Sequence, residues 1–153
     1  MGEAPSCYDK AVELLALRPH FRRQLEQKLR QRGYAEDAIG ETLARLEGQG
    51  YLDDRRLARE VAGQRSERAG EGARRVRAEL LRRGAPEEAV DEALAGSLAA
   101  DDTPAAAEAA RRWRARGGTQ PAALARHLDR KGFSQRAILS ILRGLGAEPE
   151  DAG

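Results

Sequence analysis

Apolar residues recur four positions apart along most of this chain, and a glycine interrupts the pattern at similar intervals. Residues four apart lie on one face of an α-helix, so the pattern predicts short amphipathic helices. The interrupting glycines lie 51 and 48 positions apart, and three stretches align on them without a gap: Leu25-x3-Leu29-x3-Gly33-x5-Ile39-x3-Leu43, Val76-x3-Leu80-x3-Gly84-x5-Val90-x3-Leu94 and Leu124-x3-Leu128-x3-Gly132-x5-Ile138-x3-Leu142. The alignment predicts one helical unit present three times.

The residues around each glycine predict where helices end and begin. A glycine can adopt the left-handed conformation that closes a helix, and the basic residue before it (Arg32, Arg83 or Lys131) complements the negative end of the helix dipole. Pro86 suits the first position of the following helix, and Ser134 suits an N-cap. Each aligned stretch is therefore expected to be a pair of helices joined by a short turn.

A third amphipathic stretch precedes each pair, aligned so that Leu14 falls where Trp113 falls. This makes three modules of three helices. We predict helices at 9–17, 21–32, 36–48, 54–68, 72–83, 86–96, 104–116, 120–131 and 134–144.

A module of about 45 residues buries too little surface to be very stable alone. We therefore expect the modules to pack end to end into an elongated all-α array. The predicted divisions are a disordered N-terminus at 1–8, repeats at 9–50, 51–98 and 99–146, and a disordered tail at 147–153.

Composition supports the all-α class, because the apolar residues are mainly Leu and Ala. The net charge of +2 conceals two basic blocks. Residues 54–84 carry ten basic against five acidic side chains, and residues 103–136 carry eight against two. Between them, residues 85–102 carry six acidic side chains and no basic one.

The sequence offers no support for catalysis or metal binding. The single Cys7 cannot form an internal disulfide, which suits a reducing cytosol, and no apolar run is long enough to span a membrane. His20 and His127 lack companions at zinc-ligand spacing, and no nucleotide-binding or nucleophile motif occurs. The acidic pairs 53–54 and 101–102 precede helical stretches and are predicted to cap them. We expect a cytoplasmic protein that is not an enzyme and has no cofactor.

Three segments carry a resemblance to a known family. Residues 50–58 (GYLDDRRLA) resemble the most recognisable motif of the RecX family, and residues 64–84 resemble the segment that follows it there. Residues 128–134 (LDRKGFS) are similar to the family's closing repeat. One departure is Pro19-His20-Phe21, where the family's first repeat usually has an Arg-x-His-Ser type of helix start.

The resemblance implies a regulator of homologous recombination and of the SOS response. Such proteins bind filaments of the RecA recombinase on DNA and inhibit its strand exchange, ATP hydrolysis and co-protease activity. The expected partners are therefore the RecA filament and single-stranded DNA, with double-stranded DNA as a further candidate. We expect a monomer with no membrane role.

The basic blocks supply the candidate contact residues, because arginine and lysine neutralise phosphates. The first set lies in and before the helix 72–83, and comprises Arg65, Arg68, Arg74, Arg75, Arg77, Arg82 and Arg83. The second set comprises Arg111, Arg112, Arg114, Arg130 and Lys131, with Arg116 and Arg126 nearby. Trp113, between arginines, could stack on a base, but its alignment with Leu14 favours packing.

Two other functions fit parts of the pattern. A helix-turn-helix transcriptional regulator also has a glycine that ends one helix and an apolar residue six positions later. Such proteins usually have a small residue four before the glycine, whereas this chain has Leu29, Leu80 and Leu128. A plain interaction scaffold would bind its partners without dependence on salt.

Overall fold

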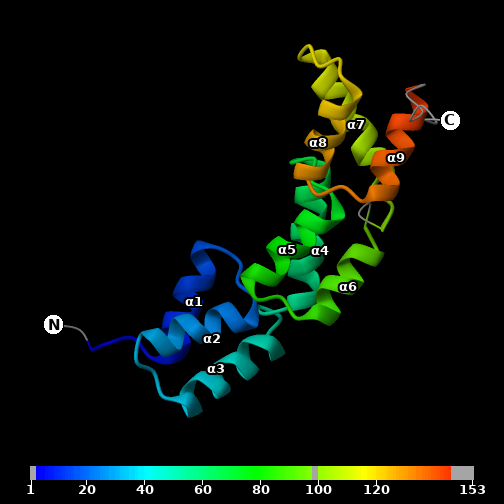
Figure 1. The fold of residues 1–153 in the computed structure, drawn as a ribbon. Helices are drawn as coiled ribbons and strands as arrows, with labels where there is room; N and C mark the ends of the chain where they lie inside the picture. The colour runs from blue at the N-terminus through cyan, green and yellow to red at the C-terminus, as the bar shows by residue number, and fades with distance from the viewer. Residues whose placement is uncertain (1–2, 98–99, 146–153) are drawn as a thin grey trace.

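The computed structural model describes residues 3–97 and 100–145. Over these residues the chain forms nine α-helices and no strand: α1 (Cys7–Leu17), α2 (Arg22–Gln31), α3 (Glu36–Gly48), α4 (Asp54–Glu67), α5 (Ala73–Arg83), α6 (Glu87–Ala95), α7 (Thr103–Ala115), α8 (Pro121–Arg130) and α9 (Gln135–Gly144). They form an all-α array of three three-helix modules, α1–α3, α4–α6 and α7–α9, which follow one another in an elongated arc (Figure 1).

Helix boundaries follow the sequence signals to within two residues. The predicted left-handed glycines are confirmed, with φ of +86° at Gly33, +97° at Gly84 and +87° at Gly132. Ser134 caps α9 by accepting a hydrogen bond from the Ala137 N–H, as predicted. Pro86 is the N-cap of α6 rather than its first residue.

The first helix begins earlier than predicted, and this corrects the expectation of a disordered stretch up to residue 8. Ser6 is the N-cap of α1, and its hydroxyl accepts a hydrogen bond from the Asp9 N–H at 3.1 Å. The cap allows Cys7 to begin the helix, and the Cys7 side chain is buried in the first module. The predicted tail at 147–153 lies outside the described residues.

Each module has its own apolar core, drawn from the residues whose periodicity predicted the helices. Leu25, Leu29 and Leu43 are buried in the first, Val76 and Leu80 in the second. In the third module Ala106, Leu124, Leu128 and Ile138 play the same part. Burial of these apolar surfaces is the main stabilising contribution to each module.

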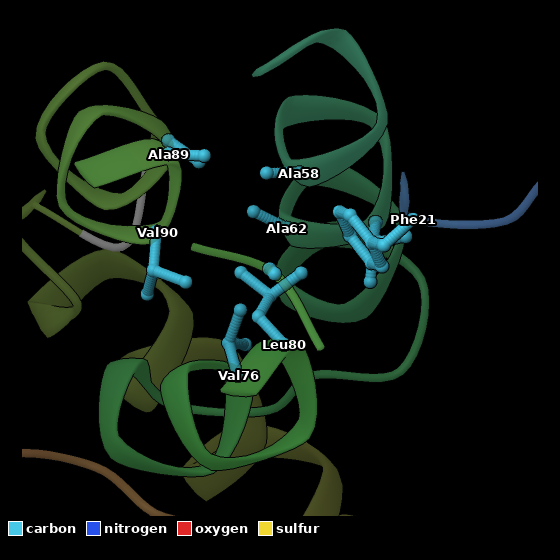
Figure 2. Packing of buried hydrophobic residues seen from close by; sticks show 10 residues of the cluster. Phe21, Ala58, Ala62, Val76, Leu80, Ala89 and Val90 are labelled. Carbon is cyan, nitrogen blue, oxygen red and sulfur yellow. The ribbon is translucent and has the colours of Figure 1, made fainter. Parts of the chain in front are cut away.

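The first and second modules exchange side chains across their joint. Phe21, which precedes α2, is fully buried in the core of the second module together with Ala58, Ala62 and Leu80 (Figure 2). Leu52, which precedes α4, packs in the opposite direction into the core of the first module. Because each core contains a residue of its neighbour, the two modules are joined by apolar burial.

The acidic pairs bind the starts of helices, but only partly their own: Asp101 accepts a hydrogen bond from the Thr103 N–H at 3.1 Å, whereas Asp102, the N-cap of α7, makes no side-chain capping bond to that helix. Asp53 caps α4 by accepting from the Arg56 N–H at 3.1 Å. Asp54 instead accepts from the Arg22 N–H at 2.9 Å, at the start of α2 in the first module. Asp102 accepts from both the N–H and the hydroxyl of Ser134, at the start of α9. The second aspartate of each pair thus ties together segments 32 residues apart.

The middle helices of the three modules lie end to end (Figure 1). At the C-terminal end of α8, the Lys131 and Gly132 carbonyls accept hydrogen bonds from the Gly72 and Arg74 N–H groups at the start of α5, at 2.9 and 3.1 Å. At the other end of α5, Gly84 lies against Arg23 and Gln24 in the first turn of α2. We call the series α8–α5–α2 the spine.

Candidate functional site

Three of the predicted contact arginines share one carboxylate. Glu79 on α5 lies 3.2 Å from Arg65, 2.6 Å from Arg82 and 2.9 Å from Arg83. The hydrogen bond from Arg82, with that from Arg83 and the nearby charge of Arg65, lowers the pKa of Glu79 to about 2. Arg65 also binds Glu71 at 2.9 Å and is largely buried, whereas the Arg82 side chain is 70% exposed. Arg65 therefore has a structural role, and Arg82 remains accessible.

Arg74 and Arg75 lie at the joint between the second and third modules. The Arg74 guanidinium donates to the Asp129 carboxylate at 2.8 Å and to the Phe133 carbonyl at 3.0 Å. Arg75 donates to the Arg130 carbonyl at 3.3 Å. Hydrogen bonds from a charged donor are among the stronger ones in proteins, so these two side chains stabilise the joint.

The two remaining arginines of the first set, Arg77 and Arg68, differ in their contacts. Arg77 forms an ion pair with Asp91 of α6 at 2.6 Å. Arg68, at the end of α4, is exposed, and its side chain has no hydrogen bond or ion pair within residues 3–97 and 100–145. Within the described residues Arg68 is therefore the one member of the first set whose side chain has no partner in the protein.

In the second set, Arg111 and Arg112 both pair with Glu108, the latter at 3.3 Å. Arg114 and the Arg130 side chain are exposed and unpaired in the described part of the chain. Trp113 packs against the core of the third module, and a Cβ on Gly118 would lie 2.4 Å from its ring. The packing role predicted for Trp113 is confirmed.

A groove of about 270 Å³ lies between the second and third modules. Its cationic lining comes from the third module: Arg112 on α7, Arg116 at the C-cap of α7 and Lys131 at the C-cap of α8. Glu67 and Glu108 also line it, and Glu108 pairs with Arg112. Arg116 and Lys131 have no ion-pair partner among the described residues, so positive charge is left over in this groove.

His127 also lines this groove, and its Nε2 atom is buried with no hydrogen-bond partner in the described structure. Burial lowers the pKa of His127, and the positive charges of Lys131, Arg130 and Arg116 lower it further. Burial is the larger cause, so the lowered pKa reflects the enclosed position of the ring more than the nearby charges. We name the groove, with Arg112, Arg116, His127 and Lys131, the basic groove.

Across 3–97 and 100–145, no three His, Cys, Asp or Glu side chains are grouped so as to hold a metal ion. None of the helices there is both long and apolar enough to cross a membrane.

Comparisons with known proteins agree with this architecture. The family model described as RecX, first three-helix domain, matches residues 7–46, and the model described as RecX, second three-helix domain, matches residues 53–94. A regulatory protein RecX from Chromobacterium violaceum is 31% identical over 155 residues, which cover 97% of this chain and 96% of that protein. The chain belongs to the RecX family.

Other RecX proteins match over shorter lengths. The regulatory protein RecX of Chlorobaculum tepidum is 39% identical over 95 residues, or 62% of this chain and 59% of that protein. In several such relatives the chain spans only about three fifths of the relative's length. The crystal structure of RecX from Lactobacillus salivarius superposes with a TM-score of 0.82 at 20% identity, covering 93% of this chain and 96% of that one. This likeness shows a shared RecX fold.

Proposed function

We propose that this protein is a non-enzymatic regulator that binds the RecA filament and its DNA in the cytoplasm, and inhibits the recombinase, ATPase and co-protease activities of RecA. Membership of the RecX family supports the choice of RecA as partner. An elongated array offers a long surface on which many weak contacts add up while each stays reversible.

The observation that carries the DNA-binding part is the surplus of positive charge in the basic groove. Arg116 and Lys131 line it without ion-pair partners in the described part of the chain. Phosphate groups of DNA would supply the missing counter-charge, and such contacts weaken as salt is raised.

The test uses the two unpaired cations rather than Arg74 and Arg75, because reversing those two would disturb the joint that they stabilise. Wild-type protein is added to RecA on single-stranded DNA while ATP hydrolysis is followed. We expect inhibition by the wild type, and its loss when Arg116→Glu and Lys131→Glu are combined. The matched control combines Arg136→Glu and Arg143→Glu, two exposed positions on α9, and should still inhibit.

Each outcome decides one point. Absence of inhibition by the wild type would refute the regulatory function. Full inhibition by the groove variant would show that inhibition does not need the basic groove. An equal loss of inhibition in both variants would show an effect of net charge alone. A footprint on one duplex sequence without RecA would instead support the helix-turn-helix regulator.

A further inference from the structure

Another group of cations, separate from the two sets named above, lies at the joint between the first and second modules, where the start of α2 contacts the end of α5 (Figure 1). Two hollows of about 420 and 350 Å³ lie side by side there and share Gln24, Arg82 and Arg83 in their linings. The close contact at Gly84, where a Cβ would lie 3.4 Å from the Arg23 Cβ, holds the two helix ends together. The hollows therefore belong to both modules and exist only when these are docked.

Basic side chains from both modules line these hollows. The first module contributes Arg18, Arg23 and Lys28, and the second contributes Arg82 and Arg83. Among the described residues that line the larger hollow there is no carboxylate, and the smaller one has only Glu60. Glu79 is shared among three arginines, so it neutralises only part of the charge of Arg82 and Arg83.

The cations of the first module are without acidic partners. The side chains of Arg18 and Arg23 have no hydrogen bond or ion pair in the portion of the chain that the structure describes. Lys28 Nζ lies 2.7 Å from Nε2 of His20, a neutral acceptor whose other ring nitrogen faces the Arg18 carbonyl at 2.8 Å. Burial and the nearby charges of Arg18 and Arg32 lower the pKa of Lys28. Arg18, Lys28 and Arg32 are thus like charges close together, and none of them has an ion-pair partner among the described residues.

The neutral part of the lining also suits an oxyanion. Gln24, Gln27 and Gln31 lie on α2 and offer amide N–H donors beside the cations. All the surrounding secondary structure is helical, so no strand edge is available to pair with the backbone of an extended peptide. A chain of phosphodiesters needs no such edge, because it carries one acceptor group and one negative charge at every step.

We propose that this joint binds the phosphodiester backbone of a nucleic acid, at a site separate from the basic groove and bridging the first two modules. The inference rests on the DNA-binding part of the proposed function and extends it to a second surface. Arg23 and Lys28 hold the phosphates from the side of α2, and Arg82 and Arg83 hold them from the side of α5.

The experiment measures DNA binding by the full chain alone, so that its result does not depend on RecA. A fluorescein-labelled oligo(dT) of twelve nucleotides is titrated with wild type and with Arg23→Gln combined with Arg82→Gln, by fluorescence anisotropy at several salt concentrations. Two lost phosphate contacts should reduce the slope of log affinity against log salt by about 1.4 and weaken binding about tenfold at low salt. The control combines Arg136→Gln with Arg143→Gln, which removes equal charge from exposed positions on α9 in the third module.

Two results would overturn the proposal. One is an unchanged affinity and salt slope in the joint variant, with circular dichroism showing the same helicity as wild type. The other is a competition result, in which a short polyglutamate peptide displaces the labelled strand as effectively as unlabelled oligo(dT) with the same number of negative charges. That result would indicate that the joint binds an acidic protein segment. If the wild type failed to inhibit RecA but the joint variant still showed the expected loss of DNA binding, only the proposed regulatory function would be contradicted.

Discussion

Substitution of Gly72 by alanine should separate the third module from the second. Gly72 is buried at the start of α5, and a Cβ there would lie 2.4 Å from both the Gly132 carbonyl carbon and the Phe133 nitrogen. Ordinary contacts of a Cβ begin at 3.4 Å, and backbone atoms cannot rotate away as a side chain can. The modules must therefore move apart by about 1 Å, the difference between these two distances.

A displacement of this size would break the hydrogen bonds of the joint. The Gly72 N–H donates to the Lys131 carbonyl at 2.9 Å and the Arg74 N–H to the Gly132 carbonyl at 3.1 Å, and both would exceed hydrogen-bonding distance. Each such bond contributes about 1 kcal/mol net, and the Arg74–Asp129 ion pair, whose side chains are 56% and 55% exposed, adds at most about 1 kcal/mol. We expect Gly72→Ala to weaken the coupling between these modules by up to about 3 kcal/mol.

Trp113 makes the effect measurable, because it is the only tryptophan of the chain and packs in the third module. In a urea titration, its fluorescence reports unfolding of the third module and circular dichroism reports all helices. For Gly72→Ala the fluorescence midpoint should fall to a lower urea concentration and separate from the circular dichroism midpoint. The control is Gly63→Ala, within α4, where a Cβ meets no atom within 4 Å and helix propensity should add up to about 1 kcal/mol. A fluorescence midpoint for Gly72→Ala equal to or above that of wild type would refute the reasoning.

Three further substitutions or titrations test other parts of the fold. Leu80→Asp should destabilise the second module by more than about 4 kcal/mol, measured by urea denaturation, because it replaces a fully buried apolar side chain with a charge. Asp102→Ala should lower the free energy of unfolding by about 2 kcal/mol, seen in Trp113 fluorescence, because the Ser134 N–H and hydroxyl both lose their acceptor. Burial lowers the pKa of His20, so the unfolded chain binds a proton more readily, and stability present above pH 6.5 should decline as the pH falls below that value. His20→Gln should reduce this decline in denaturation curves measured from pH 8 to pH 5, and an unchanged pH dependence would contradict it.

Local sequence signals predicted the helices because each signal acts within a few residues. The four-residue spacing of Leu25 and Leu29, or of Val76 and Leu80, is enough to define a buried helix face. The glycine that follows each pair closes its helix through its own backbone freedom. Repetition of these signals also made the modules visible without any knowledge of their packing.

The contacts between modules could not be predicted in the same way, because they join residues far apart in sequence and have no periodicity. Arg74 and Asp129, 55 positions apart, pair only because the start of α5 meets the end of α8. Phe21 looks like a helix-start residue of the first module, yet it is buried in the core of the second. Charge alone therefore could not distinguish arginines that stabilise joints from those left free to bind a partner.

The same limitation concealed the joint between the first and second modules as a candidate site. Residues 18–32 carry six Arg and Lys side chains against one acidic side chain, but this excess is hidden when charge is averaged over residues 1–53, where eight basic and nine acidic side chains nearly balance. Arg18, Arg23 and Lys28 gather with Arg82 and Arg83 only after docking of the modules. Asking which cations on α2 lack an acidic residue three or four positions away would have found only Lys28, because Arg23 lies three positions before Glu26.

The spine has a consequence for how the molecule can lie on a partner. The carboxyl end of α8 lies against the amino end of α5, and the carboxyl end of α5 lies against the amino end of α2. The dipoles of the three helices therefore point in the same direction. The array therefore has a direction, because its two ends differ in electrostatic character. Reversing the array along a partner that also has a direction gives a different complex. A strand of DNA has chemically distinct 5′ and 3′ directions, so the two ways of laying the protein along it must differ in energy.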